Sequence, residues 1–210
     1  MSNEFDYSGL RVVVTGGTTG IGAALVDLLK TLGSPSITVI DLKQPSVDVD
    51  AFVEANLGVE DSVAAAIDAV DGRVDVLFNN AGVAATQPPL TVMSVNYLAA
   101  RKLTLGLLPQ IPAGGAVVNT ASMAGNGWPA NLARILELLA IPGWADSLAW
   151  LEANSDLMQE VYGFSKQVAQ VYTMDIARTT IALRRPVRRV PRAASPPDPA
   201  PGRSCDHSGT

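Results

Sequence analysis

The chain has 210 residues, 48% of them apolar and 17% charged, which is enough for one domain of ordinary size or two small ones. It contains one cysteine and one histidine, Cys205 and His207, both near the C-terminus. An intramolecular disulfide needs two cysteines, and a structural zinc site usually needs four cysteine or histidine ligands. Chemistry in the body of the chain is therefore expected to use Ser, Thr, Tyr, Lys, Asn or carboxylates, with no metal.

Charge is distributed unevenly along the chain. Residues 1–183 hold 9 Lys and Arg against 18 Asp and Glu, whereas residues 184–210 hold 6 Arg, 2 Asp and 6 of the 14 prolines. The acidic body argues against nucleic acid as a partner. No apolar run approaches the roughly 18 residues of a membrane span, and the first ten residues lack the apolar region of an export signal. We therefore expect a cytoplasmic protein that does not use a membrane.

Apolar runs rich in β-branched residues alternate with segments of helical period. Strands are predicted over 10–17, 36–41, 74–82 and 115–122, with a weaker one around 50–54, and helices over 21–33, 59–71, 89–108 and 162–183. Continuous apolar strands that alternate with helices are typical of a parallel sheet covered on both faces. The predicted fold is α/β, a doubly wound, Rossmann-like parallel sheet. In the first helix the predicted buried face is Ile21, Leu25, Leu28, Leu29 and Leu32.

Residues 128–160 interrupt this alternation. They predict two short amphipathic helices divided by Pro142 and Gly143, with a third helix that starts near Ser155. One interpretation is a packed helical insertion. The other is a substrate lid or a subunit interface that makes a homo-oligomer, because aromatic residues are enriched at interfaces and three tryptophans lie here.

A glycine-rich segment, Thr15 to Gly22, follows the first strand and opens the first helix. Glycines permit a tight turn and let backbone N–H groups approach a pyrophosphate at a helix N-terminus. Asp41 ends the second strand, 19 residues after Gly22, where the dinucleotide-binding pattern places an acidic residue for the ribose hydroxyls. A carboxylate there repels a 2′-phosphate, so NAD is favoured over NADP. The simpler alternative is that Asp41 is a solvated residue at a strand end.

Several motifs then occur in a set order: TGxxxGxG at 15–22, Asn79-Asn80-Ala81-Gly82 after a strand, Asn96 in a helix, Ser122 at a strand end, and Tyr162-x-x-x-Lys166. Each match alone is weak, but all five on matching elements are specific. Over residues 8–183 the chain resembles a classical short-chain dehydrogenase/reductase.

The resemblance implies an enzyme that interconverts a small-molecule alcohol and ketone with NAD. Tyr162 would be the general acid/base, Lys166 would stabilise its phenolate and bind the nicotinamide ribose, Ser122 would hydrogen-bond the substrate oxygen, and Asn96 would hold a proton-relaying water. The implied cofactor-binding residues are Thr15, Gly16, Gly20, Ile21, Gly22, Asp41, Asn56, Leu57, Asn79, Ala81, Gly82, Tyr162 and Lys166. Of these, Asn79, Ala81 and Gly82 would line the adenosine side, with Asn79 also stabilising the sheet.

The 40 positions between Ser122 and Tyr162 exceed the dozen or so of most family members. A long insertion here is similar to the bacterial 3α-hydroxysteroid dehydrogenase/carbonyl reductase group, whose members act on steroid or xenobiotic carbonyls. That likeness implies a steroid-like or xenobiotic substrate.

Two features depart from the family. Asn56 stands where an Asp usually lies near the adenine. The resemblance also stops at about Leu183, so residues 1–183 are interpreted as an incomplete dinucleotide-binding domain that lacks the C-terminal strands. Residues 184–210 are interpreted as an Arg/Pro-rich disordered tail, truncated or translated out of frame.

Three hypotheses follow. The first is an active NAD-dependent oxidoreductase. The second is a catalytically incompetent, dinucleotide-binding remnant, for which little or no activity is expected. The third, an extended-type nucleotide-sugar epimerase, also uses Tyr-x-x-x-Lys but is disfavoured by the Asn79–Gly82 run.

Overall fold

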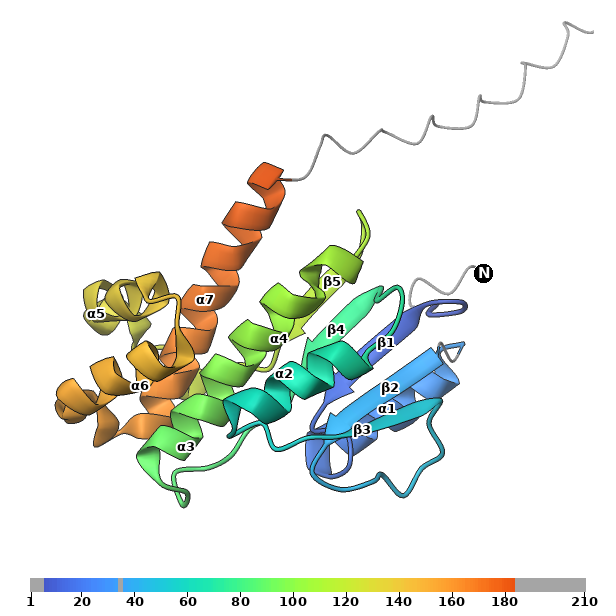
Figure 1. The fold of residues 1–210 in the computed structure, drawn as a ribbon, viewed down its shortest axis with the longest axis horizontal. Helices are drawn as coiled ribbons and strands as arrows, with labels where there is room; N and C mark the ends of the chain where they lie inside the picture. The colour runs from blue at the N-terminus through green and yellow to red at the C-terminus, as the bar shows by residue number, and fades with distance from the viewer. Residues whose placement is uncertain (1–5, 34–35, 184–210) are drawn as a thin grey trace, which may run out of the picture.

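The computed structural model describes residues 6–33 and 36–183 (Figure 1). The tail that the sequence predicts to be disordered, residues 184–210, lies outside the described residues. Five parallel strands form one sheet in the order β3-β2-β1-β4-β5. In that order the strands are β3 (Ala51–Glu54), β2 (Ser36–Asp41), β1 (Arg11–Thr15), β4 (Val76–Asn79) and β5 (Ala116–Asn119). The predicted Rossmann-like α/β fold is confirmed.

Helices connect the strands and cover the sheet. The α-helices are α1 (Gly20–Thr31), α2 (Glu60–Ala69), α3 (Pro89–Met93), α4 (Ala100–Leu107), α5 (Trp128–Ala140), α6 (Trp144–Ala153) and α7 (Val161–Leu183). A π-helical stretch, η1 (Ser94–Ala99), joins α3 to α4, so the predicted helix over 89–108 is continuous but widened at its centre. Short 3₁₀ turns are η2 (Leu108–Gln110), η3 (Met123–Gly125) and η4 (Ser155–Met158).

The valines of β1 are buried on both faces of the sheet because successive side chains of a strand point to opposite sides. Val13 packs in a cluster with Leu77 of β4 and residues of α2 and α4. Val12 and Val14 pack in a second cluster with Val26 and Leu29 of α1. In Figure 1, α2 and α4 accordingly lie on one face of the sheet and α1 on the other.

The buried face of α1 differs from the prediction. Gly22, Val26 and Leu29 are buried, whereas Ile21 is 73% exposed and Leu28 is 53% exposed. Gly22 lies against the preceding turn, where an added Cβ would stand 1.8 Å from the carbonyl oxygen of Gly16. Because of this close approach, the side of α1 that contains Gly22, Val26 and Leu29 faces the sheet. The spacing of apolar residues along the helix does not reveal such a contact.

The sheet is incompletely covered at β5. Within the described residues, β5 pairs only with β4, and Val118 is 42% exposed. The expectation of a sheet covered on both faces therefore holds for β1, β2 and β4 but not for this strand.

The insertion forms the predicted pair of helices, α5 and α6, separated at Pro142 and Gly143. Their apolar residues join α3, η1 and α7 in a third cluster, which includes Ile135, Leu138 and Leu151. Figure 1 shows α5 and α6 at one end of the molecule beside α7. In the described part of the chain, no helix is both long and apolar enough to cross a membrane.

Candidate active site

A cavity of about 620 Å³ lies at the carboxyl ends of the strands. In parallel α/β sheets this edge is where ligands bind. The cavity runs from the β1–α1 turn to the first turns of α7, and most of the predicted site residues line it. Those that do are Gly16, Gly20, Ile21, Gly22, Asp41, Asn56, Leu57, Ala81, Gly82, Ser122, Tyr162 and Lys166.

The glycine turn forms one wall of the cavity and admits no side chain at two positions. Gly16 has φ of +67°, and a Cβ there would lie 2.7 Å from the Cα of Ala81. Gly22 is blocked by the Gly16 carbonyl, as described above. The side chain of Thr19 makes no capping bond to α1, and the first N–H groups of a helix have no partner within the helix. These N–H groups and the helix dipole favour an anion at this wall.

Asp41 is held at the end of β2 by two backbone donors. Its Oδ2 accepts from the N–H of Thr18 at 3.0 Å, and its Oδ1 accepts from the N–H of Leu42 at 2.7 Å. The first of these bonds ties the carboxylate to the glycine turn. Asp41 is therefore fixed to the glycine turn and lines the cavity.

Asn56 and Leu57 line the same half of the cavity after β3. The Oδ1 of Asn56 accepts from the N–H of Gly58 at 2.9 Å, which closes a local turn. Leu57 is buried.

Three predicted site residues, Thr15, Asn79 and Asn96, are buried and do not line the cavity. The Oγ1 of Thr15 accepts from the N–H groups of Asn80 and Ala81, each at 3.0 Å. Thr15 therefore holds the 79–82 segment from beneath.

Asn79 is not at the adenosine side of the cavity, where it was expected. Its Nδ2 donates to Thr104 Oγ1 of α4 and to Asn119 Oδ1 of β5, both at 2.9 Å. The side chain therefore joins two strands to a helix, which agrees with the sheet-stabilising part of the expectation.

Asn96 lies in the π-helical stretch η1. Its Oδ1 accepts from the N–H of Val83 at 2.8 Å, and its Nδ2 donates to the carbonyl of Val83 at 3.1 Å and to Ser165 Oγ at 3.0 Å. Asn96 thus connects the loop after β4 to the first turn of α7, directly behind Tyr162 and Lys166.

Ser122, Tyr162 and Lys166 lie at the far end of the cavity from Asp41. β2 and β5 are three strand positions apart, which is about 14 Å at the usual strand spacing. The Nζ of Lys166 donates to the carbonyl of Thr120 at 2.9 Å and stands 5.8 Å from the centroid of the Tyr162 ring. Lys166 is only 5% exposed, and its burial lowers the pKa of the ammonium.

The sequence did not reveal the backbone carbonyls, or the side chain from another element, that hold the predicted site residues in place. The carbonyls of Thr120 and Val83 accept bonds from predicted site residues, and nothing in the side chains at these positions signals it. Gln170 was also missed; its Nε2 donates to the carbonyl of Ser122 at 2.9 Å. The helical insertion contributes no residue to the cavity lining, which favours its interpretation as a packed insertion over that as a lid.

A five-stranded parallel sheet with a glycine turn at its first strand defines a Rossmann-like α/β class. A family model described as short chain dehydrogenase matches residues 11–133. The chain belongs to the short chain dehydrogenase family.

The chain is 37% identical, over 163 residues, to coniferyl-alcohol dehydrogenase of Pseudomonas sp. (strain HR199 / DSM 7063). The match covers 78% of this chain but 64% of that relative, so the chain spans less than two thirds of its length.

Solved structures with similar folds include proteins bound to either nicotinamide cofactor. A short chain dehydrogenase from Leptospira borgpetersenii with bound NAD⁺ matches with a TM-score of 0.61 at 19% identity, covering 84% of this chain and 68% of that one. A short chain dehydrogenase from Burkholderia cenocepacia J2315 in complex with NADP matches with a TM-score of 0.59 at 20% identity, covering 86% and 71%. At these identities the likeness establishes the fold alone.

Proposed function

We propose that this protein is an NAD-dependent oxidoreductase that interconverts a secondary alcohol and a ketone. The observation that carries the proposal is one cavity that holds the glycine turn and Asp41 at one end and Ser122, Tyr162 and Lys166 at the other. The proposal extends to the domain boundary: residues 1–183 form the dinucleotide-binding domain.

The residues present fit a dinucleotide. The glycine wall, where Gly16 and Gly22 have no room for a side chain, brings the backbone close to a pyrophosphate beside the N-terminus of α1. Asp41 is placed to accept hydrogen bonds from ribose hydroxyls and to repel a 2′-phosphate, which supports NAD over NADP. When bound, the nicotinamide ring supplies the hydride acceptor or donor.

The chain's own residues would transfer the proton and orient the substrate. Tyr162 exchanges a proton with the substrate oxygen as the general acid/base. The ammonium of Lys166, 5.8 Å from the centroid of the Tyr162 ring, would interact with negative charge that develops during proton transfer, and burial lowers the pKa of this ammonium. Ser122 donates a hydrogen bond to the same oxygen as charge develops there. Asn96 holds the first turn of α7 in place through Ser165.

The substrate is proposed to be an apolar alcohol. Val83, Ala84 and Ala121 line the cavity together with Ser122 and Tyr162, and they offer little to a highly polar substrate. The likeness to coniferyl-alcohol dehydrogenase favours an aromatic alcohol, and the long insertion favours a 3α-hydroxysteroid. Aromatic alcohols and 3α-hydroxysteroids are therefore both candidate substrates.

The competing proposal is a dinucleotide-binding remnant without turnover. It is favoured by the exposed edge at β5 in the described residues, because a further strand beside β5 would help to hold the segment that follows β5 and carries Ser122.

The test measures cofactor binding and turnover of the full chain with NAD⁺ and NADP⁺, using coniferyl alcohol and a 3α-hydroxysteroid. We expect NAD⁺ to bind more tightly and one alcohol class to be oxidised. Tyr162→Phe should abolish turnover and leave NAD⁺ binding nearly unchanged, because it removes the exchangeable proton and keeps the ring.

Tyr7→Phe is the matched control, since Tyr7 does not line the cavity. Binding without turnover would favour the remnant. Tighter binding of NADP⁺ would contradict the role given to Asp41, and turnover by Tyr162→Phe above a few per cent would contradict that given to Tyr162.

A further inference from the structure

One face of α7 presents Tyr162, Lys166 and Gln170 at intervals of four residues. Residues at this spacing lie above one another on a helix. Lys166 and Gln170 both bind the Ser122 segment, residues 120–126. Lys166 Nζ donates to the carbonyl of Thr120 at 2.9 Å, and Gln170 Nε2 donates to the carbonyl of Ser122 at 2.9 Å. Ser122 is extended, with φ of −157° and ψ of 154°, and alternate positions of an extended segment face the same way. Two side chains of one helix therefore hold the carbonyls of Thr120 and Ser122, which are two positions apart.

The contact between this segment and α7 is close. A Cβ at Gly125 would stand 2.6 Å from the carbonyl oxygen of Lys166 and 2.8 Å from Gln170 Nε2. On the opposite side, the N–H of Thr120 donates to the carbonyl of Asn79 in β4 at 3.0 Å. The Ser122 segment is thus held between the sheet and one face of α7.

The hydroxyl of Ser122 depends on this support. Its Oγ accepts from the N–H of Ala124 at 3.2 Å and so caps η3. If the Ser122 carbonyl were released, the peptide plane and the turn after it would be free to rotate, and Oγ would move with them. Catalytic groups need placement to within about 0.5 Å, so a small rotation would matter.

We propose that Gln170 is a positioning residue for Ser122: by holding the Ser122 carbonyl, it aims the Ser122 hydroxyl at the oxygen that Tyr162 protonates. This inference rests on the proposed function. It predicts an effect on the chemical step and little effect on cofactor binding, because the glycine turn and Asp41 lie on other strands.

The test compares Gln170→Glu with Gln170→Met in the full chain. At neutral pH the Glu carboxylate would face two acceptors, the carbonyl of Ser122 and Asn126 Oδ1, the latter 3.4 Å from Nε2 in the wild type. We expect kcat to fall at least about tenfold, approaching the loss seen when a transition-state hydrogen bond is removed. The Kd for NAD⁺ should stay within about twofold of the wild type.

Protonation would give the Glu a donor again. In the direction of ketone reduction, the ratio of Gln170→Glu to wild-type kcat should rise as the pH falls from about 7.5 to about 5, near the ordinary pKa of a glutamic acid. The Gln170→Met ratio should stay low and flat, since methionine has no donor. A ratio for Gln170→Glu that is also flat would overturn the proposal.

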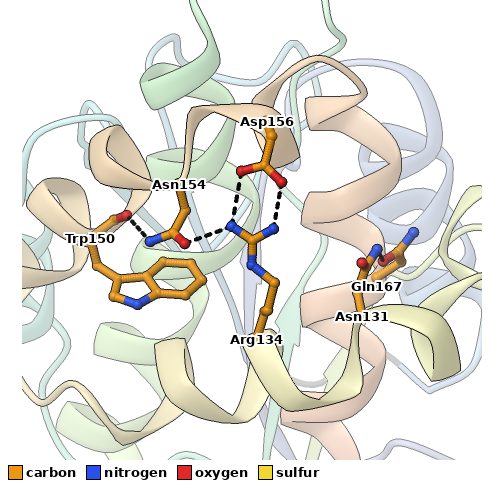
Figure 2. A network of polar contacts seen from close by, with 6 residues as sticks. All are labelled: Asn131, Arg134, Trp150, Asn154, Asp156 and Gln167. Carbon is orange, nitrogen blue, oxygen red and sulfur yellow. Dashed lines mark hydrogen bonds and ion pairs between the residues drawn. The ribbon is translucent and has the colours of Figure 1, made fainter.

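Gln167→Glu is the matched control. Gln167 is a neighbouring glutamine of α7 whose Oε1 accepts from Asn131 of α5 at 2.8 Å (Figure 2), and a glutamate keeps that acceptor. Its kcat should match the wild type. An equal loss in Gln167→Glu would show that a charge anywhere on this stretch of α7 is harmful, which would overturn the assignment to Gln170.

Amide hydrogen exchange separates this inference from the proposed function. In Gln170→Glu, and in Gln170→Met as a second variant, exchange should become faster in a peptide that covers residues 120–126 and stay unchanged in one that covers the 15–22 turn. If the wild type shows no turnover, the proposed function fails while the exchange result still decides the positioning. Unchanged exchange at 120–126, or a wild-type kcat in Gln170→Glu at neutral pH, would contradict the inference.

Discussion

At the scale of single residues, the buried cation Lys166 is the most unusual group of the site. Within the described residues its ammonium donates to the carbonyl of Thr120, and no carboxylate lies among the cavity-lining residues at this end of the cavity. Burial without a counter-ion disfavours the charged form, which is why the pKa of Lys166 is lowered.

This lowered pKa makes a prediction about stability. In the pH range between the lowered folded-state pKa and the ordinary value of 10.5, the unfolded chain binds more protons at this site than the folded one does. The contribution of Lys166 to the free energy of unfolding therefore rises with pH across that range, by at most about 1.4 kcal/mol for each pH unit. We define the stability difference as the free energy of unfolding of the wild type minus that of Lys166→Met. Measured by urea unfolding, this difference should be larger at about pH 10 than at about pH 7. A stability difference that shrinks as pH rises would contradict this account.

The sequence identifies other candidate site residues but does not show which contacts they make. Asp41 is found by its spacing after the glycine turn, and Tyr162, Lys166 and Ser122 are found by the resemblance of their motifs to those of the family. The burial of Asn79 beneath the cavity could not be found this way, since it depends on Thr104 and Asn119, which are 25 and 40 positions away.

At the scale of elements, the insertion is stabilised by a polar network around Arg134 of α5 (Figure 2). Its guanidinium donates to both carboxylate oxygens of Asp156 in η4, one of them at 2.9 Å, and to Asn154 Oδ1 at 2.6 Å. The Nδ2 of Asn154 in turn donates to the carbonyl of Trp150 at the end of α6, at 2.7 Å. One side chain of α5 thereby fixes the end of α6 and the start of the connection to α7.

Arg134→Gln should loosen this connection without unfolding the protein. We expect faster amide exchange over residues 154–158 at neutral pH, and no change in the sheet, because the network joins α5, α6 and η4 and includes no strand residue. The hydrogen bonds from Arg134 lower the pKa of Asp156, so its stabilising contribution is present above the ordinary value of 3.8 and is lost as pH falls through the lowered one. The difference in protection between wild type and variant should therefore shrink in strong acid to the part that the bond to Asn154 Oδ1 contributes. A difference that did not shrink there would show that the ion pair is not its source.

At the scale of the whole molecule, β5 is one of the two edge strands of the sheet in the described part of the chain, the other being β3. Val118 is 42% exposed, and within the described residues the strand has a neighbour on one side only. An edge strand that carries an exposed apolar side chain favours pairing with another chain.

Val118→Lys should reduce concentration-dependent self-association, because a charged side chain at an edge strand opposes such pairing. Light scattering over a concentration series would measure it. Leu28→Lys, at an apolar residue that lies on helix α1 and is 53% exposed, is the control for added charge. Equal improvement by both variants would show that net charge, and not the edge, governs association.

The sequence by itself determined the order and type of the elements and pointed to the candidate site residues. These depend on short-range features: apolar period, the glycine turn, and motif spacing along one strand or helix. Tertiary structure alone decided which face of α1 is buried, where Asn79 lies, and that Gln170 holds Ser122. The physical reason is that each of these is set by a close contact between atoms brought together by folding: Gly22 on the Gly16 carbonyl, Asn79 on Asn119, and Gln170 on a carbonyl 48 positions away.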